Sequence, residues 1–270
     1  MSASAAAGGW TDLLRPAGPA APAARVLVFP HAGAGPLRYR APLSRLSDDV
    51  ELVGVTLPGR GRRVVEPLST CAAEAAEGVL RELRRLPPAP TVLYGHSMGG
   101  LLAVAVADLA GDDPAAVNCG AVVVSCAPPG ARTPLPLEDI LAMHGLPRGA
   151  LRECEGRSDR GDSGDATGFD WDARVLAHDL SLSLQALTAV RGARLTVPLT
   201  ALAGHDDQLV PAEDVPRWAA FTQAAYRQRL VAGGHFFPFA PSGTDVLLAE
   251  LDAALHAAVT SGCRPAAPRV

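Results

Sequence analysis

TVLYGHSMGGLLAVAVADL, residues 91–109, passes from an apolar, β-branched run through Gly-His-Ser-Met-Gly-Gly into an amphipathic run. This pattern predicts a buried strand, a tight glycine turn and a helix, in that order. Ser97 lies in the turn, where a nucleophile elbow places its serine. Because flanking glycines let the chain turn sharply and let a substrate approach, we interpret Ser97 as a nucleophile rather than an ordinary turn residue.

Apolar runs alternate with helical patterns along most of the chain. Strands are predicted at residues 25–29, 50–55, 91–94, 121–126, 195–203 and 226–231. Helices are predicted at residues 36–46, 71–86, 100–111, 212–225 and 243–259. Repeated β-then-α order predicts an α/β domain with a mainly parallel sheet, helices on both faces and functional residues at the carboxyl ends of strands.

One region departs from this alternation. Residues 127–190 contain no convincing strand, and residues 152–172 are rich in Gly, Ser and charge, so we expect a helical insertion with a mobile loop that forms a lid. The predicted organisation is an N-terminal lead-in (1–24), one domain (25–260) that includes the insertion, and a flexible tail (261–270).

Composition excludes several classes of protein. The 270 residues are 48% hydrophobic with a net charge of -4, which fits one α/β domain and suggests neither nucleic-acid nor membrane binding. No secretory signal is recognisable at the N-terminus. Five scattered cysteines without a CxxC pair argue against a disulfide framework and a zinc site, and favour the cytoplasm. All 24 basic residues are arginine, which excludes lysine-based covalent chemistry.

A serine nucleophile needs a base, and the base needs an orienting carboxylate. His235, in VAGGHFFPF, follows the last predicted strand, as the α/β-hydrolase chain order of Ser, acid and His requires. The acid comes from LTALAGHDDQLVP, where two adjacent aspartates cannot both face one imidazole. Asp207 is our choice, because it stands three residues after Gly204 and three before Val210. Asp206 remains the alternative.

Acyl transfer also needs amide donors for the oxyanion that forms during the reaction. The residue after the nucleophile, Met98, supplies one amide in nucleophile elbows. The second should come from the loop after the first core strand, FPHAGAG at 29–35, in which Ala32 is the predicted donor. No metal and no diffusible cofactor is required by such a site.

These motifs together resemble the type II thioesterases of polyketide and nonribosomal peptide assembly lines. The resemblance lies in VLVFPHAGAG, LPGRGRR (57–63), YGHSMGG, GHDDQLVP and GGHFF, in this order. It implies the α/β-hydrolase fold, a Ser97, Asp207 and His235 triad, and the insertion at 127–190 as the lid. It also implies a discrete enzyme that hydrolyses acyl or aminoacyl groups from the phosphopantetheine arm of an acyl or peptidyl carrier protein.

The chain differs from this family at two places. Gly61 and Arg62 stand where the family has an acidic pair after Pro-Gly-Arg, and Ala177-His178-Asp179 replaces its usual Arg-Ala-Asp. The arginine of that Pro-Gly-Arg, Arg60, has two interpretations. It contacts a phosphate or an acidic carrier protein, or it is a structural hydrogen-bond donor after the turn.

Three alternatives to the carrier-protein thioesterase stay open. A general carboxylesterase would use the same triad on oxygen esters. An acyltransferase would pass the acyl group to a second carrier protein instead of to water. A hydrolase-fold interaction protein would not be an enzyme at all. In every case we expect a cytoplasmic monomer.

Overall fold

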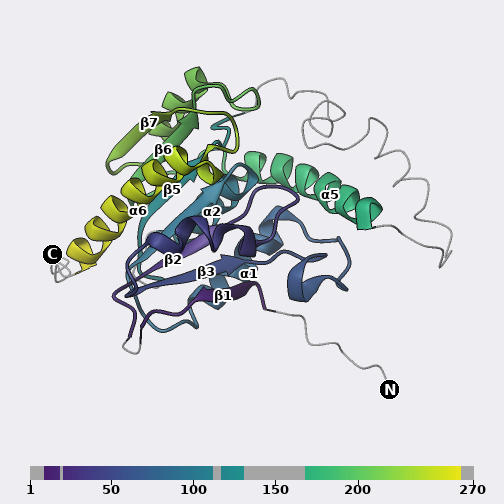
Figure 1. Cartoon of the computed structure of the whole chain (residues 1–270), viewed down its shortest axis with the longest axis horizontal. Coiled ribbons are helices and arrows are strands. Elements are labelled where there is room, and N and C mark those ends of the chain that lie inside the picture. Colours follow the sequence, from purple (N-terminus) through teal and green to yellow (C-terminus); the bar gives the residue numbers. More distant parts are fainter. Residues whose placement is uncertain (1–8, 19–20, 112–116, 131–167, 263–270) are drawn as a thin grey trace.

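The protein is described by a computed structural model over residues 9–18, 21–111, 117–130 and 168–262 (Figure 1). A single seven-stranded sheet runs through it in the order β1-β3-β2-β4-β5-β6-β7. The strands are β1 (Thr11–Arg15), β2 (Ala24–Phe29), β3 (Val50–Val55), β4 (Thr91–His96), β5 (Cys119–Ser125), β6 (Leu199–Gly204) and β7 (Tyr226–Val231). Within these ranges, β1 pairs with β3 antiparallel and the remaining pairs are parallel. The predicted mainly parallel sheet is confirmed.

Helices cover both faces of this sheet. The α-helices are α1 (Ala72–Leu83), α2 (Met98–Ala110), α5 (Gly168–Ala189) and α6 (Pro241–Gly262). Side chains of β4 alternate between the faces, because successive residues of a strand point to opposite sides. Leu93 packs with α1, α2 and α5, whereas Val92 and Tyr94 pack with α6. Each inner strand is therefore buried on both sides, which explains its continuous apolar sequence.

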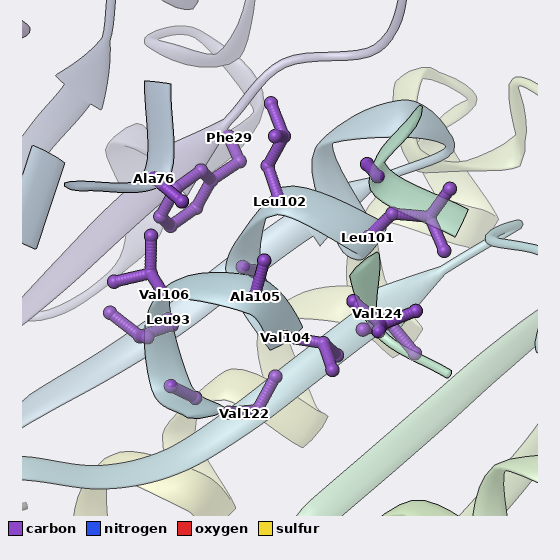
Figure 2. Close-up of a cluster of buried hydrophobic side chains, with 14 of the residues drawn as sticks. Phe29, Ala76, Leu93, Leu101, Leu102, Val104, Ala105, Val106, Val122 and Val124 are labelled. Atoms are coloured by element: carbon purple, nitrogen blue, oxygen red, sulfur yellow. The ribbon is translucent and has the colours of Figure 1, made fainter. Parts of the chain in front are cut away.

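Helix α2, which follows the elbow, has 11 of its 13 residues buried, and Figure 2 shows several of their side chains in the core. Leu101 and Val104 lie beside Val122 and Val124 of β5, while Ala76 of α1 approaches from another side. Full burial of each large apolar side chain contributes about 1.5–3 kcal/mol. The elbow is thus built on a rigid part of the core.

Strand β1 was not predicted, and it lies inside the expected N-terminal lead-in. Its sequence, TDLLR, buries only Leu14, so it lacks the apolar pattern of the inner strands. It forms because the free edge of β3 offers backbone hydrogen-bond partners. The preceding Trp10 packs closely on α1, where a Cβ at Gly78 would lie 2.3 Å from the indole ring.

Two predicted α-helices are 3-10 helices instead. The segment predicted at 36–46 divides into η1 (Pro36–Tyr39) and η2 (Pro42–Arg45), because each proline starts a new turn and cannot continue the previous one. The segment predicted at 212–225 forms η5 (Ala212–Phe221), which contains Pro216. Both predictions were wrong in helix type, since proline removes an N–H that an α-helix needs.

Other elements differ from the predictions at their ends. The sixth strand begins at Leu199, because Leu195 forms only an isolated bridge to Thr222. Of the predicted lid, residues 131–167 lie outside the described part, as do 263–270 of the predicted tail. Helix α5 forms residues 168–189 of the predicted insertion. Among the described residues, no helix combines the length and the apolar character needed to cross a bilayer.

Candidate active site

Ser97 stands between the last residue of β4 and the first residue of α2. Its backbone has φ 55° and ψ -121°, a conformation that non-glycine residues adopt rarely and at a cost of about 1–3 kcal/mol. The Ser97 amide donates to the Ser125 carbonyl oxygen at 2.8 Å, which holds the turn against β5. Ser97 is partly exposed although its neighbours His96 and Met98 are buried. The structure therefore has the strained, accessible geometry predicted for the elbow.

Glycines are required here because three segments meet without space between them. A Cβ at Gly95 would lie 2.2 Å from the carbonyl oxygen of Gly99. A Cβ at Gly99 would lie 2.0 Å from the carbonyl oxygen of Phe29, at the end of β2. Such distances are far below van der Waals contact. The same close approach brings the start of α2 to the loop that follows β2.

The predicted base and acid meet at the carboxyl ends of β6 and β7, which are neighbouring parallel strands. His235 Nδ1 lies 2.9 Å from Asp207 Oδ2 and 3.1 Å from Oδ1. Asp207 Oδ1 also accepts hydrogen bonds from the amides of Leu209 at 2.9 Å and Val210 at 3.0 Å. These amides fix the carboxylate, and the carboxylate orients the imidazole.

The choice between the two adjacent aspartates follows from their surroundings. Burial by itself raises the pKa of Asp207, but the hydrogen bond and charge of His235 and the Val210 amide outweigh it and hold the pKa below its ordinary value. Asp207 is therefore ionised at neutral pH. Asp206 is exposed and pairs with the exposed His205 at 2.8 Å. The structure brings Asp207, not Asp206, to His235.

His96, directly before Ser97, is a buried neighbour of the nucleophile. Its Nδ1 lies 2.9 Å from Ser125 Oγ, and its ring centroid lies 5.2 Å from that of His235. Burial, followed by electrostatic interaction with His235 and His31, lowers the pKa of His96 well below the ordinary value. The ring thus stays neutral and packs against His235.

Sequence reasoning missed Cys126, which follows β5 directly. Its sulfur lies within 4.8 Å of ligand atoms of Asp207 and His235. The residue adopts φ 49° and is buried. The sequence could have indicated Cys126 by its position at the carboxyl end of a central strand, because functional residues of parallel sheets lie at these ends.

The side chains of Cys126, Asp207 and His235 are also of the types that bind metal ions. Ligands about 2.1 Å from a tetrahedral metal ion lie about 3.4 Å apart. The 2.9 Å between His235 Nδ1 and Asp207 Oδ2 is instead a hydrogen-bond distance. As built, the arrangement fits an oriented imidazole better than a metal centre.

The loop after β2 forms a turn, closed by the Ala34 amide, which donates to the His31 carbonyl oxygen at 3.1 Å. Ala32 in this turn and Met98 at the start of α2 belong to the same buried cluster. Within the described parts of the chain, neither the Ala32 nor the Met98 amide donates to another residue. Both predicted oxyanion donors are therefore unoccupied amides on segments that approach one another.

Arg60 is a structural residue of this site. Its Nη1 and Nη2 each lie 2.6 Å from one carboxylate oxygen of Asp179, and Nη1 also donates to the Ala34 carbonyl oxygen at 3.0 Å. Arg60 is only 9% exposed. Of the two interpretations of this arginine, the structure favours the hydrogen-bond donor over the contact with a phosphate or a carrier protein.

Known proteins are similar over nearly the whole chain. A family profile described as the Thioesterase domain matches residues 24–134. RedJ, a thioesterase from the prodiginine biosynthetic pathway in Streptomyces coelicolor, is 30% identical over 94% of this chain and 96% of its own, with a TM-score of 0.68. The type II thioesterase BorB from the borrelidin biosynthetic cluster is 26% identical over 92% of this chain and 96% of its own, with a TM-score of 0.71. This likeness confirms the α/β-hydrolase fold.

A curated relative shows the same similarity in sequence. The probable cadicidin biosynthesis thioesterase of Streptomyces griseus is 29% identical over 252 residues, which cover 87% of this chain. The match spans 63% of that relative's length.

Proposed function

Since this chain belongs to the type II thioesterases, we propose that it hydrolyses acyl or aminoacyl thioesters from the phosphopantetheine arm of carrier proteins. Removal of stalled or misprimed chains is the proposed biological role. The observation that best supports the chemistry is the 2.9 Å contact between His235 Nδ1 and Asp207 Oδ2, at the same end of the sheet as the strained elbow at Ser97. Nucleophile, base and acid are the groups that acyl transfer through a serine needs.

In the proposed first step, His235 accepts the hydroxyl proton of Ser97 while the Ser97 oxygen attacks the thioester carbon. The negative carboxylate of Asp207 stabilises the imidazolium that forms. When the tetrahedral intermediate collapses, the carbon–sulfur bond breaks and His235 returns the proton to the departing sulfur. The pantetheine thiol leaves, and the acyl group remains on Ser97 as an ester.

The amides of Ala32 and Met98 are the proposed donors to the oxyanion. Their support is that neither donates to another described residue, so both are free to bind the developing charge. Met98 also begins a helix, whose positive dipole end favours a negative charge at this place. Loss of one such donor costs on the order of 10² to 10³ in turnover.

In the second step, His235 removes a proton from water, and the water oxygen attacks the acyl-serine carbon. Collapse of this intermediate breaks the bond to the Ser97 oxygen, which takes the proton back from His235. The products are the free acid and the original enzyme. The steps need no metal and no diffusible cofactor.

An acyl or peptidyl carrier protein is the proposed partner, because RedJ and BorB are named as thioesterases of biosynthetic pathways. We further propose that the protein acts as a monomer in the cytoplasm, without binding nucleic acid or membranes. The mild net charge of -4 supports the last part of this proposal.

The test follows acyl release from a purified acyl-carrier protein by intact-protein mass spectrometry. The same acyl group on a short pantetheine mimic is measured in parallel, with wild type and Ser97→Ala. We expect wild type to clear the carrier much faster than the mimic, and Ser97→Ala to lose about 10⁴-fold or more in turnover. Full activity of Ser97→Ala would refute the triad.

The same assay separates the alternative functions. Equal turnover of carrier and mimic would identify a general esterase. Transfer of the acyl group to a second carrier thiol faster than to water would identify an acyltransferase. If a fluorophosphonate fails to label Ser97 in wild type, the chain is an interaction protein rather than a hydrolase.

A further inference from the structure

Asp179 of α5 joins segments that lie far apart in the sequence. Its Oδ2 accepts hydrogen bonds from the Gly33 amide at 2.7 Å and from Arg60 Nη1 at 2.6 Å, and its Oδ1 accepts from Arg60 Nη2 at 2.6 Å. The side chain is fully buried, with 0% exposure. A buried carboxylate is tolerated because the guanidinium neutralises it and the amide completes its hydrogen bonding.

These contacts hold the half of the turn that follows Ala32. Asp179 binds the amide of Gly33, the next residue, and Arg60 binds the carbonyl oxygen of Ala34 at 3.0 Å. The turn itself is closed between Ala34 and His31. The Ala32 amide is therefore the N–H of this turn that remains available to a ligand.

Gly33 does not by itself fix the backbone conformation of the turn. It has φ 79°, a conformation open to glycine, which has no Cβ and large backbone freedom. The residue is exposed, but Leu176 of α5 packs on it, with a side-chain carbon 3.3 Å from where a Cβ would stand. The conformation of the turn thus depends on what α5 places against it.

We propose that Asp179, supported by Arg60, is a positioning residue that holds the Ala32 amide where the oxyanion forms. This inference rests on the proposed function, because it assigns Ala32 the role of an oxyanion donor. Asp179 does not touch substrate. It acts through Gly33, so helix α5 controls the geometry of a donor in the loop after β2.

Helix α5 has further anchors, so loss of Asp179 should leave it in place. Trp171 Nε1 donates to the Gly59 carbonyl oxygen at 2.9 Å, and His178 Nε2 lies 3.0 Å from the Thr70 carbonyl oxygen. Substitution of Asp179 can therefore displace the turn without detaching the helix. A small displacement is sufficient, since an error of about 1 Å can cost on the order of 10²-fold in rate.

The experiment compares Asp179→Leu and Asp179→Asn with wild type, using turnover of an acyl thioester per active site titrated with a fluorophosphonate. We expect kcat per site to fall about 10- to 100-fold in Asp179→Leu, with KM changed less than about threefold. Asp179→Asn keeps an acceptor oxygen for Gly33 and should retain more of kcat. The affinity for an acyl trifluoromethyl ketone, which forms an oxyanion on Ser97, should fall in parallel with kcat.

Glu51→Gln is the matched control, because it disrupts the ion pair between buried Arg25 and partly buried Glu51 at the other end of β2. We expect it to lower stability while leaving kcat per site unchanged. If Asp179→Leu behaves like this control, or raises KM alone, the positioning role is overturned. Failure of wild type to label or to hydrolyse thioesters would instead refute the proposed function.

Discussion

Two buried aspartates, Asp207 and Asp179, have much in common and differ in their partners. Both side chains are 0% exposed, and both accept hydrogen bonds from backbone amides. For each, burial raises the pKa, but the hydrogen bonds and electrostatic interaction with the partner side chain outweigh it, so both have a pKa below the ordinary value. Asp207 faces the imidazole of His235, whereas Asp179 faces the guanidinium of Arg60.

The difference teaches that a buried, ionised carboxylate does not by itself identify a catalytic acid. Imidazole gains and loses a proton near neutral pH, whereas guanidinium stays charged at every pH that a protein survives. The pair of Asp207 and His235 can therefore move a proton. The pair of Asp179 and Arg60 can only fix geometry.

The largest expected effect tests the proton-moving pair. Asp207→Asn should lower kcat about 10⁴-fold, because an amide no longer stabilises the imidazolium or its tautomer. Asp206→Asn, one residue away and exposed, should change kcat less than about twofold. Steady-state kinetics on an acyl thioester measure both. Similar losses of kcat in the two variants would show that activity depends on the loop after β6 as a whole, rather than on the contact between Asp207 and His235.

The next largest effect tests the pair of Asp179 and Arg60 by measuring the stability of the fold. Arg60→Met leaves the Asp179 carboxylate buried without its cation and should lower the free energy of unfolding by about 3–5 kcal/mol. The double variant Arg60→Met/Asp179→Leu should recover most of this loss, because no unpaired charge remains. Urea unfolding measures the free energy of unfolding of wild type, the single variant and the double variant. A double variant as unstable as Arg60→Met would contradict the unpaired charge as the cause.

A third prediction concerns the loss of stability at low pH. A carboxylate whose folded pKa is lowered contributes stability that is present above its unfolded pKa and is lost as pH falls through the folded value. Since the pKa of Asp179 lies below 3.8, stability should fall below about pH 4. In Asp179→Asn this fall should be shallower, with urea midpoints compared at pH 7 and pH 3. An identical fall in wild type and variant would show that other carboxyl groups control acid unfolding.

The smallest expected effect concerns Cys126, whose buried thiol lies beside Asp207. Cys126→Gly relieves the positive φ but removes a buried thiol, so the free energy of unfolding should change by less than about 1 kcal/mol. We expect kcat to change less than about fivefold, because Asp207 keeps its amide donors. Cys126→Ala, which retains a Cβ and its strain, separates the two contributions. A loss as large as that of Asp207→Asn would place the thiol in the proton-moving pair.

Some of this site could be predicted from local sequence. Ser97 lies in a short strand–glycine–helix pattern, and the order of Ser97, Asp207 and His235 follows a known chain order. The contact between Asp207 and His235 then required only that β6 and β7 be neighbours. Their catalytic roles stay predictions for the experiments above.

The sequence by itself determined the order of the strands and helices from β2 onward and the glycine turn at Ser97, because hydrophobic period and missing Cβ atoms act over a few residues. Only the tertiary structure decided that β1 joins the sheet and that Asp179 meets Gly33 and Arg60. Those contacts span 146 and 119 residues. No local pattern encodes them, since they exist only once helix α5 has packed against the core and placed its carboxylate beside the loop after β2.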